Sequence, residues 1–131
     1  QRIKKKSISG KINLLEADSL EKKTLNLVKK IIKNNKRTLI HLDSHHTKDH
    51  VYNELCAYTK LLKKNDMIIV GDTILEYIPA QLHRPRPWGK GNNPKIALDI
   101  FLKENKSFKI IKEISSKQLL SNNPNGYIKK I

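Results

Sequence analysis

Several kinds of residue and segment are scarce in this sequence, and each shortage narrows the class of protein. Cys56 is the single cysteine, which excludes an internal disulfide and fits a reducing compartment such as the cytoplasm. No apolar run approaches the roughly 18 residues that a membrane-spanning helix needs, and the first residues show no signal-peptide pattern. We therefore expect a cytoplasmic protein with no membrane partner.

Acidic residues are also scarce, and 12 Asp and Glu against 27 Lys and Arg leave a formal net charge of +15. Such a balance is typical of proteins that bind nucleic acids or other anionic surfaces. The lysines are spread over nearly every segment, however, and no recognised nucleic-acid motif accompanies them. Aromatic residues, which stack on bases, make up only 5% of the chain. We interpret most lysines as solvent-facing and keep charge-driven nucleic-acid binding as a weaker alternative.

The length of the chain allows one domain, residues 1–131. Residues 1–11 are basic and polar and are predicted to form an N-terminal tail. Apolar periodicity and turn residues in the rest predict the order β-α-β-α-β-loop-α-β-β. The predicted strands span 12–18, 38–42, 67–71, 108–114 and 118–121, of which the last two pair antiparallel. The predicted helices span 20–34, 48–62 and 94–105, and a long loop spans 74–93.

Two short apolar runs, Leu39–Leu42 and Met67–Val70, flank a helical pattern of crossover length. This arrangement predicts a βαβ unit with parallel strands. Asp43 follows the first strand and Asp72 the second, so both carboxylates are expected at the carboxyl edge of the sheet, where open α/β sheets bind ligands. Paired carboxylates suit a hard divalent cation such as Mg²⁺. The alternative is that each acid merely caps the element that follows it.

His46 lies one helical turn beyond the first of these carboxylates and is a candidate general base. A histidine exchanges a proton near neutral pH, and a metal-bound hydroxyl is easier to deprotonate. His41, in the middle of a predicted strand, is interpreted as a packed core residue. The loop 74–93 contains Arg86 and Trp88 among several prolines and glycines. Loops this long are functional or mobile, so we expect an active-site loop or, alternatively, a solvated one.

Four strings of residues lie at the ends of the predicted strands 38–42 and 67–71, in the long loop and in the last turn. They are Leu42-Asp43-Ser44-His45-His46-Thr47-Lys48-Asp49-His50-Val51, Val70-Gly71-Asp72-Thr73, Arg86-Pro87-Trp88-Gly89-Lys90-Gly91-Asn92-Asn93-Pro94-Lys95 and Asn123-Pro124-Asn125-Gly126-Tyr127. Together they resemble the cephalosporin hydroxylase/rhamnosyl O-methyltransferase family, from about residue 12 to the end of the chain. The string that begins at Arg86 is long and specific, so the resemblance is strong.

The resemblance implies an α/β fold with a Rossmann-like class I methyltransferase sheet and a C-terminal antiparallel strand pair. It implies an O-methyltransferase that uses S-adenosylmethionine (SAM) and Mg²⁺ or another divalent cation, with a hydroxyl of a sugar or small metabolite as acceptor. By this resemblance, Asp43 and Asp72 are the metal carboxylates and His46 is the catalytic base. The cofactor-binding residues are Asp18, Ser19 and Asp43, and the substrate-binding residues are Arg86 and Trp88.

Two departures from the family pattern bear on activity. Family members usually have an acid just before the second metal carboxylate, where this chain has Gly71. The strand and glycine-rich turn that hold the donor do not precede residue 12, so the chain resembles the C-terminal part of an incomplete domain. The strand 38–42 is then an open edge, and we expect self-association through it or pairing with the missing N-terminal portion. The alternative function is a non-catalytic remnant that serves as a binding or assembly module.

Overall fold

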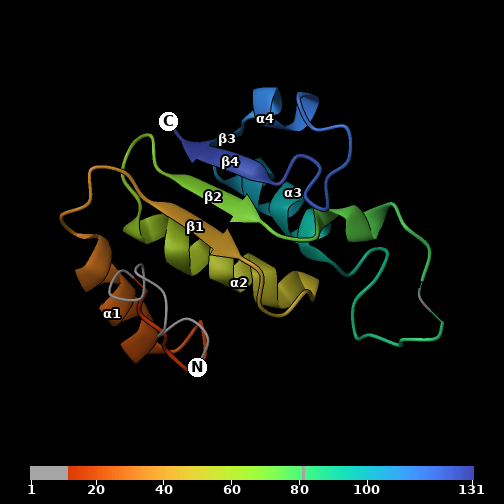
Figure 1. The fold of residues 1–131 in the computed structure, drawn as a ribbon, viewed down its shortest axis with the longest axis horizontal. Coiled ribbons are helices and arrows are strands. Elements are labelled where there is room, and N and C mark those ends of the chain that lie inside the picture. The colour runs from red at the N-terminus through yellow and green to blue at the C-terminus, as the bar shows by residue number, and fades with distance from the viewer. Residues whose placement is uncertain (1–11, 81) are drawn as a thin grey trace.

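The computed structural model describes residues 12–80 and 82–131, which form a mixed four-stranded sheet with helices packed on it (Figure 1). The α-helices are α1 (Lys22–Ile32), α2 (Lys48–Tyr58), α3 (Pro94–Glu104) and α4 (Lys112–Ser116), and the 3₁₀ turns are η3 (Thr59–Leu61) and η4 (Thr73–Glu76). The strands are β1 (Leu39–Leu42), β2 (Met67–Val70), β3 (Phe108–Ile110) and β4 (Tyr127–Lys130), in the spatial order β1-β2-β4-β3. None of the helices in the described ranges is both long and apolar enough to cross a membrane.

The predicted βαβ unit is present. β1 and β2 pair in parallel, with Leu39 opposite Met67 and Leu42 opposite Val70, and α2 connects them. Because the two strands end in register, the residues that follow them lie at the same edge of the sheet. The loop after η4 extends beyond this edge, to the right in Figure 1. The strand pair therefore places the predicted functional segments together.

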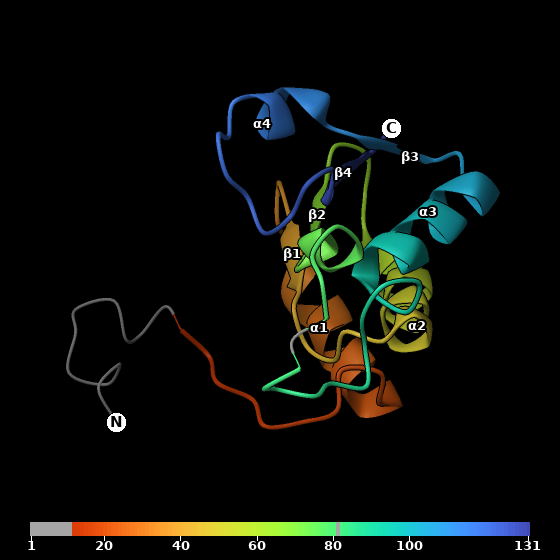
Figure 2. The same ribbon diagram turned by 90° about the vertical axis from the view of Figure 1, so that its right-hand side faces the viewer.

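Helices α2 and α3 pack against each other on one face of the sheet (Figure 2). Apolar residues recur along α2 at the 3.6-residue helical period, so they lie on one side of the helix, and that side faces the sheet. The buried core cluster includes Val51, Leu55, Tyr58 and Leu62 from α2 and the residues after it, Leu98 and Phe101 from α3, and Ile68, Val70 and Ile128 from the sheet. This core is the rigid base from which the loops at the carboxyl edge extend.

The first predicted strand is wrong, because residues 12–18 form no regular structure. Ile12, Leu14 and Leu15 are 38%, 77% and 58% exposed, and no strand in the described part of the chain pairs with them. A strand needs a neighbouring strand to pair with its backbone N–H and C=O groups. An apolar pattern in the sequence does not by itself supply that neighbour. The tail predicted at 1–11 lies outside the described residues.

The C-terminal antiparallel pair is confirmed, but with a different second strand. β3 ends at Ile110, α4 replaces the rest of the predicted strand 108–114, and residues 118–121 form no strand. The partner of β3 is β4, which lies between β3 and β2 and is antiparallel to both. Leu119 and Leu120 are 98% and 91% exposed, whereas Tyr127 and Ile128 are buried. Burial between two strands therefore outweighs the local apolar pattern.

β1 is an edge strand of the described sheet, as predicted. Successive residues of a strand point to opposite faces: Leu42 is buried, whereas Leu39 is 59% exposed and His41 is also exposed. The prediction that His41 packs in the core is therefore wrong, since it lies on the face that α2 and α3 do not cover. On α1, Leu27 and Ile31 are likewise 39% and 55% exposed.

Candidate functional site

Asp43, His46 and Asp72 come together at the carboxyl edge of β1 and β2. His46 Nε2 lies 3.3 Å from Asp43 Oδ1 and 3.2 Å from Asp72 Oδ2. The histidine side chain is 13% exposed, and the two carboxylates are 53% and 40% exposed. The parallel strand pair thus brings together residues that are far apart in the chain, as the sequence predicted.

The backbone at Asp72 is held in an unusual conformation. Its φ of 49° is in the left-handed region, which side-chain-bearing residues rarely adopt. Asn123 Oδ1 accepts a hydrogen bond from Asp72 N at 2.8 Å, and Thr73 Oγ1 donates one to Pro124 O at 2.9 Å. The turn before β4 therefore fixes the strained residue in place. The sequence analysis predicted a turn there but not this role, although Asn123 begins one of the strings that carry the resemblance.

Gly71 lies against the first carboxylate. A Cβ atom at position 71 would come within 2.6 Å of Asp43 Oδ1 and 2.9 Å of Leu42 O. A side chain there would displace the Asp43 carboxylate from its present position. In this structure the Asp43 carboxylate therefore occupies space that a side chain at position 71 would need.

The polar atoms of His46 are available for chemistry. Neither Nδ1 nor Nε2 has a hydrogen-bond partner in the described structure, although both atoms are buried. Nε2 is close to both carboxylates but not aligned for a hydrogen bond with either. One face of the imidazole instead approaches Trp88, with 5.1 Å between ring centroids. His45 is not part of this cluster, since its Nδ1 lies 3.0 Å from Thr47 Oγ1.

The three side chains fit a divalent cation. One potential ligand atom from each lies within 4.8 Å of the other two. Adjacent ligands of an octahedral Mg²⁺ ion stand about 3 Å apart, which is close to the two measured separations from His46 Nε2. Carboxylate oxygens suit Mg²⁺, and an added imidazole nitrogen extends the choice to first-row transition metals.

Polar contacts join the two ends of the loop 74–93 to each other and to the start of α2. Glu76 Oε2 accepts hydrogen bonds from Gly91 N at 2.8 Å and Asn93 Nδ2 at 2.6 Å. The bond from the Gly91 amide, then that from Asn93, lowers the pKa of Glu76. Asn92 Oδ1 accepts from Lys48 N at 3.0 Å and so satisfies an amide at the start of α2. The loop is thus anchored and not simply solvated.

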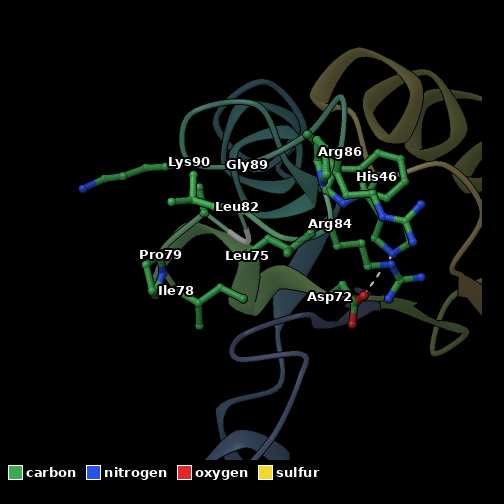
Figure 3. A pocket seen from close by; sticks show the side chains of 13 residues that line it. His46, Asp72, Leu75, Ile78, Pro79, Leu82, Arg84, Arg86, Gly89 and Lys90 are labelled. Atoms are coloured by element: carbon green, nitrogen blue, oxygen red, sulfur yellow. Dashed lines mark ion pairs between the residues drawn. The ribbon is translucent and has the colours of Figure 1, made fainter.

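A cavity of about 550 Å³ opens between this loop and the cluster (Figure 3). His46 and Asp72 line one end, and η4 with the residues after it supplies an apolar wall that includes Leu75 and Ile78. The substrate-binding residues predicted from the sequence, Arg86 and Trp88, also line it. The loop therefore encloses a space next to the predicted catalytic histidine.

A second hollow, of about 480 Å³, runs along the open edge of β1. Ser19, Asp43 and Glu54 are among its lining residues, whereas Asp18 is not. The Asp18 carboxylate accepts a hydrogen bond from Leu20 N at 2.8 Å and so supports the turn before α1. Two of the three predicted cofactor-binding residues, Ser19 and Asp43, thus border this hollow.

The sequence analysis missed a polar network between this hollow and the cluster. Glu54 is 1% exposed, and its Oε1 accepts a hydrogen bond from Ser44 Oγ at 2.8 Å. His50 Nε2 lies 3.0 Å from Ser44 Oγ and 3.4 Å from Glu54 Oε1. Glu54 Oε2 is buried without a partner in the described structure. The sequence feature that could have revealed this network is the spacing of His50 and Glu54, which stand four residues apart on one face of the helix.

Of the comparisons with known proteins, the one with family models found a match. The family model described as Rhamnosyl O-methyltransferase/CmcI matches residues 1–131, the whole chain. The chain belongs to this family, which implies that it is an O-methyltransferase, and the resemblance read from the sequence is confirmed. Comparisons with curated proteins and with solved structures gave no match.

Proposed function

We propose that the chain carries the metal and acceptor side of a SAM-dependent O-methyltransferase that acts on a hydroxyl of a sugar or small metabolite. The observation that carries the proposal is the meeting of Asp43, His46 and Asp72 beside a partly enclosed cavity, which His46 and Asp72 line. Clusters of this kind with convergent polar groups in a concave site are typical of active sites. The described sheet is compatible with one side of a Rossmann-like class I methyltransferase.

Asp43 and Asp72 would hold a divalent cation, Mg²⁺ or a similar metal, through their carboxylate oxygens. When bound, the metal would orient an acceptor hydroxyl and make it more acidic. Two carboxylates are enough for Mg²⁺, whose other ligands are commonly water and substrate. Gly71 supplies no ligand, so the site depends on these two carboxylates more than a site with an adjacent acid would.

His46 would take the proton from the acceptor hydroxyl. Its Nε2 has no hydrogen-bond partner in the described structure and can accept a proton there. The imidazolium that forms would be stabilised by the two carboxylates at 3.2 and 3.3 Å. Removal of this proton from the hydroxyl is the task of a general base in transfer to oxygen.

The methyl donor would be SAM, which supplies an electrophilic methyl group. Ser19 and Asp43 border the hollow along β1, and the unpartnered Glu54 Oε2 offers a buried acceptor for a donor group of the ligand. We also propose that the open edge of β1 pairs with another strand, from a second copy or from an N-terminal portion of the domain. Such pairing would complete the wall of this hollow.

Metal binding by the purified chain tests the proposal. Electron paramagnetic resonance of Mn²⁺ should show a bound ion, and the Asp43→Asn and Asp72→Asn variants should bind it at least about tenfold more weakly. Asp49→Asn is the matched control, because this side chain is 85% exposed and lies in the same segment. Equal affinity in all four proteins would exclude the metal site.

The role of His46 is tested separately. His46→Gln should leave Mn²⁺ affinity nearly unchanged and abolish methyl transfer from SAM to a responsive acceptor in a panel of sugars and hydroxylated metabolites. A loss of Mn²⁺ affinity as large as that in Asp72→Asn would instead make His46 a metal ligand. If the wild type neither binds metal nor transfers a methyl group, the chain is a non-catalytic binding or assembly module.

A further inference from the structure

The cavity beside the cluster contains cationic side chains that lack acidic partners. Arg84 and Arg86 both line it, and neither forms an ion pair among the described residues. Asp72 is the single carboxylate of the described lining. The nearby acid Glu76 is occupied by Gly91 N and Asn93 Nδ2. The guanidinium groups are therefore free to bind a ligand.

The two arginines face the reactive end of the cavity. Figure 3 shows the Arg84 and Arg86 side chains directed toward His46 and Asp72, whereas Lys90 points away from them. Arg86 Cζ lies 5.3 Å from the centre of the Trp88 ring, and the same ring lies 5.1 Å from that of His46. The Trp88 ring thus lies close to both a guanidinium and the candidate base.

Charge balance also favours an anion at this position. In the proposed site a divalent cation is balanced by Asp43 and Asp72, so Arg84 and Arg86 remain uncompensated beside it. Cations gathered in a partly enclosed site repel one another unless an anion lies among them. Guanidinium groups bind phosphate and carboxylate through paired hydrogen bonds, which fixes both the position and the orientation of the ligand.

We propose that the acceptor is an anionic hydroxyl compound, with a phosphate or carboxylate group that Arg84 and Arg86 bind about one sugar ring away from the hydroxyl that is methylated. The inference rests on the proposed function and names the substrate class of that site. The apolar wall formed by Leu75 and Ile78 would contact the uncharged face of the same ring. An acceptor without the anion would leave both guanidinium groups unpaired.

Fluorescence of Trp88, the single tryptophan of the chain, reports binding at this place. The chain with saturating Mg²⁺ is titrated with glucose, glucose 6-phosphate and glucuronate, which differ in the anion. Glucose 6-phosphate or glucuronate should bind at least about tenfold more tightly than glucose, the scale expected of hydrogen bonds to charged groups. The two anionic probes distinguish a phosphate from a carboxylate.

The variants test which cations are responsible. Arg84→Gln/Arg86→Gln should remove the preference for the anion, and Arg84→Gln alone should weaken it while retaining the contact of Arg86 with Trp88. Lys103→Gln/Lys109→Gln removes the same charge from exposed positions outside the cavity and should retain the preference. Equal binding of the three sugars, absence of binding by all three, or an equal loss in both double variants would overturn the inference.

This result is separable from the metal test. If Mn²⁺ binds to the wild type and depends on Asp72 while the three sugars bind equally, the anionic acceptor is wrong and the metal site stands. If the anion preference depends on the arginines but no metal binds, the proposed catalysis is wrong and the cavity is an anion-binding site.

Discussion

At the scale of single residues, Gly71 is the position where a small change should have the largest effect on the site. Its backbone passes so close to Asp43 that a Cβ atom would lie 2.6 Å from a carboxylate oxygen. Nothing comparable surrounds Gly89, where a Cβ would meet no atom within 4 Å. Gly71 lies against Asp43 and Gly89 lines the cavity beside His46, so the two glycines form a matched pair.

We predict that Gly71→Ala weakens Mn²⁺ binding by at least about tenfold, because the methyl group displaces the Asp43 carboxylate. Overpacking should also destabilise the fold by about 1–3 kcal/mol. Mn²⁺ titration and urea denaturation measure the two effects. Gly89→Ala is the control and should leave metal affinity unchanged. Wild-type metal affinity in Gly71→Ala would show that Asp43 can move without loss.

At the scale of elements, the long loop is joined to α3 through one buried side chain. Asn93 Oδ1 accepts hydrogen bonds from Lys95 N at 2.9 Å and Ile96 N at 3.3 Å and so caps α3. Pro94 occupies the first position of this helix, where proline is favoured. Its Nδ2 donates to Glu76 and to Gly89 O. The capping residue therefore also holds the loop that encloses the cavity.

We predict that Asn93→Ala destabilises the protein by about 2 kcal/mol, since it removes a helix cap and leaves buried polar groups without partners. The midpoint of urea denaturation measures this change. Asn53→Ala, at an exposed position of α2, is the control and should change stability little. Equal midpoints for the two variants would show that the loop and helix do not depend on Asn93.

The same loop should respond to pH through Glu76. Hydrogen bonds from Gly91 N and Asn93 Nδ2 lower the pKa of this carboxyl in the folded protein. A lowered pKa means that the ionised group stabilises the fold above its ordinary pKa, and that the contribution is lost as pH falls through the lowered folded value. Glu76→Gln should therefore melt a few degrees below wild type at neutral pH.

The difference in melting temperature between Glu76→Gln and wild type should shrink as the solution is acidified into the range where carboxyl groups protonate. Thermal unfolding at a series of pH values measures it. Glu113→Gln, which removes an acid from the exposed surface of α4, is the control. A constant difference across the pH range would show that ionisation of Glu76 does not contribute.

At the scale of the whole molecule, the sheet ends in an apolar edge while the chain carries a net charge of +15. Leu39 on that edge is 59% exposed, and nothing in the described part of the chain pairs with the outer side of β1. An open edge favours pairing with another strand, whereas like charge opposes association of two copies. Salt screens the charge and leaves the edge unchanged.

We predict that this 131-residue chain self-associates more strongly as salt is raised, and that Leu39→Lys shifts it toward the monomer. Sedimentation velocity at several salt concentrations measures the equilibrium. Leu82→Lys is the control, because this leucine is 91% exposed but lies in the loop and not on the edge. The same association in both variants would place the contact elsewhere than on β1.

The sequence by itself determined the elements whose signals are local. The two strands of the βαβ unit, the helix between them and the helix that begins at residue 94 followed from apolar periodicity and turn residues, which act within a few positions. The meeting of Asp43 and Asp72 also followed, since parallel strands joined by a helix end at one edge. His46 followed as a neighbour of the first of these carboxylates.

Only the tertiary structure decided the features that depend on distant partners. Residues 12–18 and 118–121 have strand-like patterns but no neighbour to pair with, whereas β4 gains two neighbours and becomes the buried strand. The close approach of Gly71 to Asp43 and the direction of Arg84 toward the cluster involve segments joined through space. A sequence pattern records what a segment can bury, and the folded chain decides which partner covers it.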